Sequence, residues 1–196
     1  GVEEKILLEL GLISESKGKY YDKFRNRVIF PIINTAGRVI GFGGRAIGDA
    51  QPKYLNSPEN KVFQKKNNLY ALNICKQDIG RQNSAILVEG YMDVISLYQA
   101  GVRNAIASLG TALTENQARL IKRYTKNVIL SYDADQAGRK AARRGIDVLS
   151  GQGSACHRRK RPGRVHQAAR QGCFSRTYRK STSDDRLQTG FAETEY

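Results

Sequence analysis

The stretch that decides the fold is "AILVEGYMDVISL", residues 85 to 97, in which a short apolar run ends at an acid and a glycine. The run at 85 to 88 is continuous, as in a strand that is covered on both faces. Val94 and Leu97 then have the spacing of one helical face, so the stretch predicts a strand followed by a helix. A carboxylate, Glu89, stands where the buried strand ends, which calls for an explanation.

The same pattern occurs twice more downstream. Two further apolar runs are each followed by a helical pattern, and Thr114 and Gln117 have the spacing of a helix capping box. The strands are "AIASL" at 105 to 109 and "VILSY" at 128 to 132, and the helices are "TENQARLIKRYT" at 114 to 125 and "AGRKAARRGIDVL" at 137 to 149. Such alternation predicts an α/β fold with a parallel sheet flanked by helices, in which ligands bind outside the carboxyl ends of the strands.

The preceding part of the chain has a different pattern. "RVIFPII" (27 to 33) and "RVIGFGG" (38 to 44) are strand-like runs joined by "NTAG", which predicts a β-hairpin with Gly37 in its turn. The glycines at the end of the second run indicate either a ligand contact or tight packing. "PKYLNSPENKVFQKK", residues 52 to 66, is polar and basic, so we expect a surface segment that holds phosphates and stacks a base.

Composition narrows the class of partner. The 196 residues include 33 Lys and Arg against 18 Asp and Glu, a net charge of +15 that favours a polyanion such as nucleic acid. No apolar run approaches the roughly 20 residues that cross a bilayer, and no secretion signal is evident, so we expect a cytoplasmic protein without a membrane partner. The three cysteines are not in CxxC spacing, which argues against a disulfide framework or a zinc ribbon. Because the chain begins without methionine, we expect it to be part of a longer protein.

Two more acids answer the question that Glu89 raises. Asp133 and Asp135 follow the strand at 128 to 132, so all three acids are expected at one edge of the sheet. Carboxylates about 5 Å apart repel by roughly 3 kcal/mol at an effective dielectric near 20, and a hard divalent cation removes that conflict. Oxygen ligands without histidine or cysteine suit Mg²⁺ or Mn²⁺. The alternative for Asp135 is a helix cap, and Gly138 at the helix start adds an amide donor for an anion.

These motifs resemble a known family. "VEGYMDV", "ASLGTALT" and "SYDADQAGRKAA" are similar to the Toprim domain, and with "YYDKFRNRVIFPI", "GRVIGFGGR" and "PKYLNSPENKVF" they resemble bacterial DnaG-type DNA primases. The resemblance spans roughly residues 1 to 150. It implies a Toprim-type sheet at 83 to 150, preceded at 1 to 82 by part of a smaller α+β N-terminal subdomain.

The resemblance also implies a chemistry: metal-assisted ribonucleotidyl transfer that makes RNA primers from ribonucleoside triphosphates on a single-stranded DNA template during replication. Glu89, Asp133 and Asp135 would be the catalytic, metal-binding acids. Zinc and the replicative helicase would bind through regions outside this chain. The residues that would handle nucleic acid or nucleotide are Arg27, Arg45, Lys53, Tyr54, Asn56 and Lys65.

The last part of the chain departs from the family pattern. Residues 151 to 196 contain almost no Val, Ile or Leu, so we expect no further strand from them and an unpacked tail. Where primases have an acidic segment resembling GKDPDE, residues 159 to 174 read "RKRPGRVHQAARQGCF". Read one frame over, their codons permit GKDPDEFIKQQGKDAF, so we interpret the tail as an out-of-frame translation. A basic arm that binds nucleic acid and a zinc set of cysteines and histidines are the alternatives.

Other functions stay open at this point. A topoisomerase shares the Toprim acids, although its tyrosine nucleophile would lie in a separate domain. A phosphatase with a DxD nucleophile would carry it after the first strand of its sheet, whereas Asp133 follows a later one. A non-catalytic remnant that binds nucleic acid is the third alternative, because the altered tail puts activity in doubt.

Overall fold

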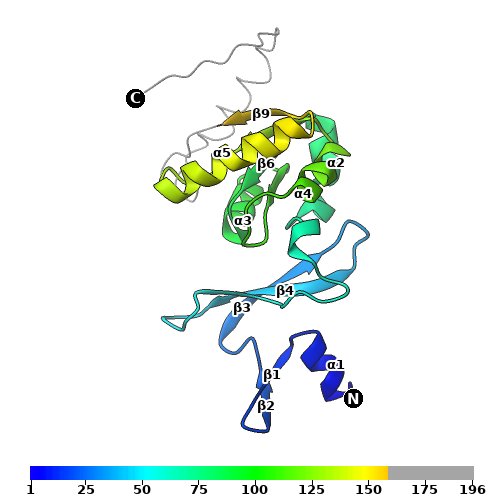
Figure 1. The fold of residues 1–196 in the computed structure, drawn as a ribbon, viewed down its shortest axis with the longest axis vertical. Coiled ribbons are helices and arrows are strands. Elements are labelled where there is room, and N and C mark those ends of the chain that lie inside the picture. Colours follow the sequence, from blue (N-terminus) through cyan, green and yellow to red (C-terminus); the bar gives the residue numbers. More distant parts are fainter. Residues whose placement is uncertain (159–196) are drawn as a thin grey trace.

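A computed structural model describes residues 1 to 158 of the chain (Figure 1). In chain order the elements are α1 (Glu4–Glu9), β1 (Ile13–Ser16), β2 (Lys19–Asp22), β3 (Arg27–Ile33), β4 (Val39–Ala46), β5 (Tyr54–Asn56), the 3₁₀ helix η1 (Lys65–Asn67), α2 (Leu72–Gln82), β6 (Ala85–Val88), α3 (Tyr91–Gln99), β7 (Ala105–Ala107), α4 (Glu115–Lys122), β8 (Asn127–Leu130), α5 (Gln136–Gly151) and β9 (Ala155–Arg158). No helix in this part of the chain combines the length and the apolar character needed to span a membrane.

The second half of the described chain is built on a four-stranded parallel sheet, which confirms the predicted α/β fold. The strand order is β7-β6-β8-β9, and every neighbouring pair is parallel. All four residues of β6 are buried, as the continuous apolar run at 85 to 88 predicted. The capping box predicted from Thr114 and Gln117 opens α4, with the Thr114 side chain accepting from the Gln117 backbone N–H.

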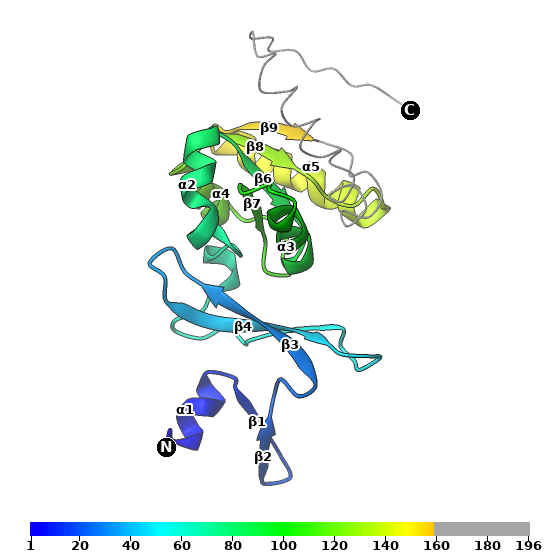
Figure 2. The same ribbon diagram turned by 180° about the vertical axis from the view of Figure 1, so that it is seen from behind.

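The connections leave the sheet in opposite directions from its two central strands. From β6 the chain runs through α3 to β7 on one side, and from β8 it runs through α5 to β9 on the other. Parallel crossovers are right-handed, so α3 and α5 lie on opposite faces, as Figures 1 and 2 show. The carboxyl ends of β6 and β8 therefore flank the point where ligands bind in open α/β sheets.

The first half holds two small antiparallel sheets. One is the hairpin of β1 and β2, and the other is a three-stranded sheet in the order β3-β4-β5. The predicted hairpin at 27 to 44 is confirmed, and Gly37 in its turn has a φ of +82° that side chains rarely adopt. Figure 2 shows the three-stranded sheet between the β1–β2 hairpin and the parallel sheet.

An aromatic cluster joins the three-stranded sheet to the parallel-sheet half. Tyr91, the first residue of α3, stacks on Phe30 of β3 at 5.3 Å between ring centroids and meets Tyr70 edge-on at 4.7 Å. A side chain at Gly43 of β4 would come within 2.7 Å of the Tyr91 ring. The glycines at 41, 43 and 44 all lie against aromatic rings, so tight packing accounts for them.

One expectation from the sequence is wrong. We expected no strand after residue 151, but β9 pairs with β8 from Ala155 to Arg158. An edge strand is held by backbone hydrogen bonds, which need no apolar sequence, and Cys156 packs against the core. The out-of-frame hypothesis rests on residues 159 to 174, which lie outside the described residues.

Most of the segment at 52 to 66 is exposed or half-buried, as its polarity predicted, but part of it is anchored in the fold. It supplies strand β5, and the side chain of Phe63 is fully buried in the aromatic cluster. Asn60 allows this course because its side-chain oxygen accepts from the backbone N–H groups of Val62 and Phe63. A local Asx turn thus folds one apolar side chain inward from a polar stretch.

Candidate active site at the carboxyl ends of the central strands

Glu89 continues the ladder between the two central strands with its side chain. The Ser131 N–H donates to the Leu87 carbonyl at 2.9 Å, as in a regular parallel pair. Two residues further on, the Asp133 N–H donates to the Glu89 carboxylate, Oε1, at 2.6 Å. The carboxylate thereby holds the start of the loop after β8 through the backbone of Asp133.

Asp135 caps helix α5. Its Oδ1 accepts from the Gly138 N–H at 2.7 Å, the N-cap geometry that was one interpretation of this residue. The Gly138 amide is therefore used within the loop, which corrects the expectation that it donates to an anion. A Cβ at Gly138 would lie 2.2 Å from the Asp133 carbonyl oxygen, so only glycine fits where the loop turns into the helix.

A pocket of about 430 Å³ opens beside these acids. Glu89 and Asp135 line it from the ends of β6 and β8, while one wall comes from α5 and another from the loop after β7. The remaining lining residues are Ser108, Gly110, Thr111, Ala112, Tyr132, Ala137, Gly138, Lys140, Ala141 and Arg144. The pocket therefore combines two carboxylates with two cations at the position where the strand connections diverge.

The three acids do not converge as closely as the sequence predicted. Asp133 is exposed and is not among the residues that line the pocket. Within residues 1 to 158, no three His, Cys, Asp or Glu side chains are arranged to hold a metal ion. Two carboxylates that share a pocket are nevertheless hard oxygen donors, a set that fits a divalent cation whose other ligands are waters and substrate phosphates.

Tyr132 forms the buried floor beside the acids. Burial raises the pKa of its phenol, and the nearby Glu89 carboxylate raises that pKa further. The phenol is thus neutral at physiological pH. A neutral hydroxyl beside Glu89 leaves the negative charge of the pocket to its carboxylates.

The predicted nucleic-acid residues of β4 and β5 share one face of the three-stranded sheet. Arg45 is the cross-strand neighbour of Tyr54, and Gly43 is the neighbour of Asn56 two pairs further along. Side chains alternate along a strand, so these residues lie on the same face, the one that Tyr91 contacts at Gly43. Arg45 and Tyr54 therefore lie on the parallel-sheet side, two residues from the contact.

Asn56 connects this face to the pocket. Its side-chain oxygen accepts a short hydrogen bond from the Tyr91 hydroxyl, and its amide group donates to the Leu109 carbonyl at 3.4 Å. Leu109 lies between Ser108 and Gly110, two residues after β7 that line the pocket. In this structure the Asn56 side chain thus joins the two halves of the molecule, a role that the sequence did not indicate.

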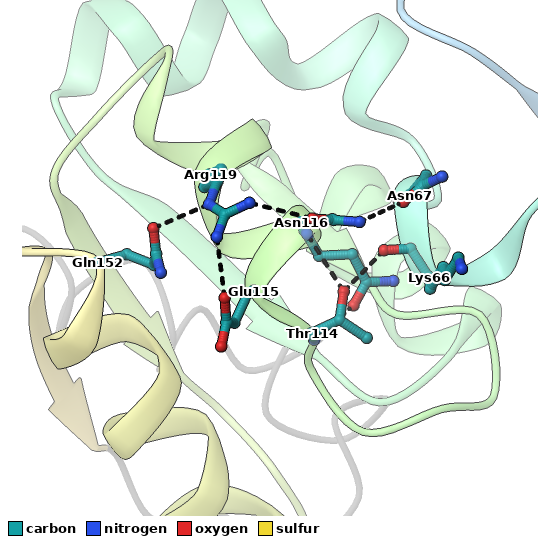
Figure 3. A network of polar contacts seen from close by, with 8 residues as sticks. Lys66, Asn67, Thr114, Glu115, Asn116, Arg119 and Gln152 are labelled. Atoms are coloured by element: carbon teal, nitrogen blue, oxygen red, sulfur yellow. Dashed lines mark hydrogen bonds and ion pairs between the residues drawn. The ribbon is translucent and has the colours of Figure 1, made fainter.

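Lys65 lies on η1, which is fastened to the start of α4. The Gln117 side-chain amide donates to the Lys65 and Asn68 carbonyls, each at 2.9 Å, and the Thr114 hydroxyl donates to the Lys66 carbonyl at 2.7 Å. Figure 3 shows how Asn116 and Arg119 extend this network. The backbone that carries Lys65 is thereby fixed to the parallel-sheet half.

Arg27 and Lys53 lie near each other at the outer end of the three-stranded sheet. The Arg27 guanidinium donates to the Pro52 carbonyl at 2.7 Å, directly before the exposed Lys53. Arg27 therefore supports the turn before β5, and its role in binding nucleic acid stays a prediction.

Two basic residues at this site were not among those predicted from the sequence. Lys140 and Arg144 line the pocket from α5, but in the sequence they belong to a basic helix whose inner positions were assigned from its apolar residues. Their spacing of four, which places them on one face of the helix that Asp135 caps, was the available signal.

Comparison with known proteins agrees with this geometry. The family profile for the DNA primase catalytic core, N-terminal domain, matches residues 1–76, and a Toprim-like profile matches residues 86–167. The DNA primase of Clostridium acetobutylicum is 57% identical over 150 residues, which are 76% of this chain and 25% of that protein. The chain belongs to the bacterial DnaG-type primase family. It spans about a quarter of the length of the curated primases it matches.

Solved primase structures share the fold. One is the structure of the zinc-binding and RNA polymerase domains of the Aquifex aeolicus primase. It has a TM-score of 0.82 and 41% identity to this chain, and the match covers 90% of this chain and 45% of that one. A DnaG primase catalytic domain bound to single-stranded DNA also has a TM-score of 0.82, with 40% identity over 90% of this chain and 60% of that one. The primase family thus accounts for both halves of the described fold.

Proposed function

We propose that this chain carries part of the catalytic centre for RNA primer synthesis on single-stranded DNA. The observation that carries the proposal is that Glu89 and Asp135 line one pocket, at the point where the connections after β6 and β8 diverge. Family membership supports the reaction class, which is transfer of a ribonucleotide from its triphosphate to a 3′-hydroxyl. The structure of a related primase catalytic domain bound to single-stranded DNA supports single-stranded DNA as the proposed template.

Glu89, Asp133 and Asp135 are the proposed metal ligands, with Mg²⁺ as the first candidate and Mn²⁺ as the second. When bound there, such an ion would activate the attacking hydroxyl and neutralise charge on the leaving oxygen. The support is the donor chemistry: the acids at this edge are carboxylates, and Asp133 lies two residues before Asp135 on the same exposed loop.

Basic and aromatic residues of the N-terminal half are proposed to position the nucleic acid. Arg45 and Tyr54 share a face that ends at Asn56, and Asn56 contacts a residue that lies between two residues of the pocket. A template or primer lying on that face would reach the pocket with its phosphates near Arg45 and a base near the Tyr54 ring. Lys53 and Lys65 are proposed further phosphate contacts, and Arg27 supports the turn that carries Lys53.

Replacement of Glu89 by Gln tests the proposal. The amide keeps the size of the side chain and its acceptor oxygen for the Asp133 N–H but removes the charge, so we expect primer synthesis to disappear. Binding of a single-stranded oligonucleotide should remain, because the basic residues are unchanged. The measurement is incorporation of labelled ribonucleotide on single-stranded DNA, alongside oligonucleotide binding by fluorescence anisotropy.

Asp147→Asn is the matched control, since Asp147 is an exposed acid on α5 that does not line the pocket. It should synthesise primers as the unaltered chain does. Synthesis by Glu89→Gln at ordinary Mg²⁺ concentration would refute the role of Glu89.

A further inference from the structure

The pocket has a basic wall as well as an acidic one. Lys140 and Arg144 lie one helical turn apart on α5 and line the same pocket as Glu89 and Asp135. Both cations are exposed, and neither forms a salt bridge among the described residues. An acidic edge and a basic wall thus face one volume of about 430 Å³.

The charges that line the pocket indicate which ligand it can bind. A magnesium nucleoside triphosphate carries a net charge of about −2, so a pocket lined only by two carboxylates would repel it. The two cations make the formal charge of the pocket neutral, and they would pair with phosphate oxygens that a metal ion does not hold. An arginine can donate to two phosphate oxygens at once, while a lysine acts as a point charge.

We propose that Lys140 and Arg144 bind the β- and γ-phosphates of the incoming nucleoside triphosphate, which leave together as pyrophosphate. The inference rests on the proposed function and adds a polyphosphate subsite on α5. The oxygen of the attacking 3′-hydroxyl forms a bond to the α-phosphorus and its proton passes to water. The bond from that phosphorus to the bridging oxygen breaks, and the electron pair goes to the pyrophosphate. Lys140 and Arg144 stabilise the charge on that leaving group.

A nucleic-acid phosphodiester is the competing ligand for two cations. The structure favours the triphosphate because Lys140 and Arg144 share the pocket with the acids, whereas Arg45 and Tyr54 lie on the three-stranded sheet. A diester carries one charge per phosphate, while a triphosphate presents several charges to one pair of cations. The experiment therefore measures both ligands.

Arg143 provides a matched control for Arg144. It is the preceding residue of the same helix, is equally exposed, and does not line the pocket. Arg144→Gln and Arg143→Gln remove the same charge from adjacent positions, so non-specific electrostatics affects both alike. Arg139 is a poorer control because its guanidinium donates to the Ala134 carbonyl at 2.5 Å within the acid loop.

The test is binding, measured on the whole chain by isothermal titration with three probes. The probes are ATP with Mg²⁺, inorganic tripolyphosphate in EDTA, and a single-stranded oligothymidylate. We expect Arg144→Gln to weaken binding of ATP and of tripolyphosphate about tenfold, and the double variant Lys140→Gln/Arg144→Gln to weaken both further. Arg143→Gln should stay within about twofold of the unaltered chain for every probe.

Three outcomes would overturn the subsite: equal effects of Arg143→Gln and Arg144→Gln on ATP, a loss confined to the oligonucleotide, or no binding of ATP and tripolyphosphate by the unaltered chain. Glu89→Gln separates this proposal from the metal proposal. It should remove the gain in ATP affinity that Mg²⁺ gives and leave tripolyphosphate binding in EDTA intact. If Mg²⁺ gives the same gain with Glu89→Gln, the metal proposal fails while the subsite stands.

Discussion

At the scale of the residue, each acid of the site has a structural task beside its proposed chemical one. Asp135 caps α5 through Oδ1, and Glu89 accepts the Asp133 N–H through Oε1. A carboxylate has two oxygens with about four lone-pair positions, so one oxygen can hold the loop while the other binds a cation. Capping and metal binding, which were alternatives for Asp135 in the sequence, are therefore compatible.

Gly138 makes the turn between the acids possible, and its replacement tests that role. We expect Gly138→Ala to lower the free energy of unfolding by about 1–3 kcal/mol, since its Cβ would meet the Asp133 carbonyl at 2.2 Å. Gly80→Ala in α2 is the control, because a Cβ there meets nothing within 4 Å and should stabilise the helix by about 0.5–1 kcal/mol. Urea unfolding of both variants measures the difference. Equal changes with the same sign would contradict the account of Gly138.

At the scale of the element, the sequence predicted those segments whose signals are local. Strands β6, β7 and β8 of the parallel sheet, α4 with its capping box and the hairpin turn at Gly37 all have such signals. Helix α2 does not, because it begins after Ala71 in a left-handed conformation, with φ at +64° and no side-chain cap. Strand β9 has none either, since pairing with β8 determines it.

The contact between the three-stranded sheet and the parallel-sheet half depends in part on one hydrogen bond, from Tyr91 on α3 to Asn56 on β5. We expect Tyr91→Phe to keep the ring stacked on Phe30 but to destabilise the chain by about 1 kcal/mol, because the Asn56 oxygen loses its partner. A double-mutant cycle with Asn56→Ala, measured by urea unfolding, should give a coupling energy of about 0.5–1.5 kcal/mol. Strictly additive effects would show that the two side chains do not stabilise the contact together.

At the scale of the whole molecule, the site depends on information that no local pattern contains. The sequence placed Glu89, Asp133 and Asp135 at strand ends, but it did not give the order β7-β6-β8-β9. That order makes β6 and β8 neighbours and sends their connections to opposite faces, which opens the pocket between Glu89 and Asp135. The basic wall of Lys140 and Arg144 follows from the same topology, because α5 begins at that divergence.

Binding of Mn²⁺ shows whether the carboxylates at this edge hold a divalent cation. Titration of the chain with Mn²⁺, followed by the electron paramagnetic resonance signal of the free ion, gives the affinity without requiring activity. We expect the unaltered chain and the control Asp147→Asn to bind Mn²⁺ alike. Glu89→Gln should bind it at least about tenfold more weakly, as should Asp135→Asn, in which asparagine still caps α5. Equal Mn²⁺ affinity of Glu89→Gln and the unaltered chain would contradict the account.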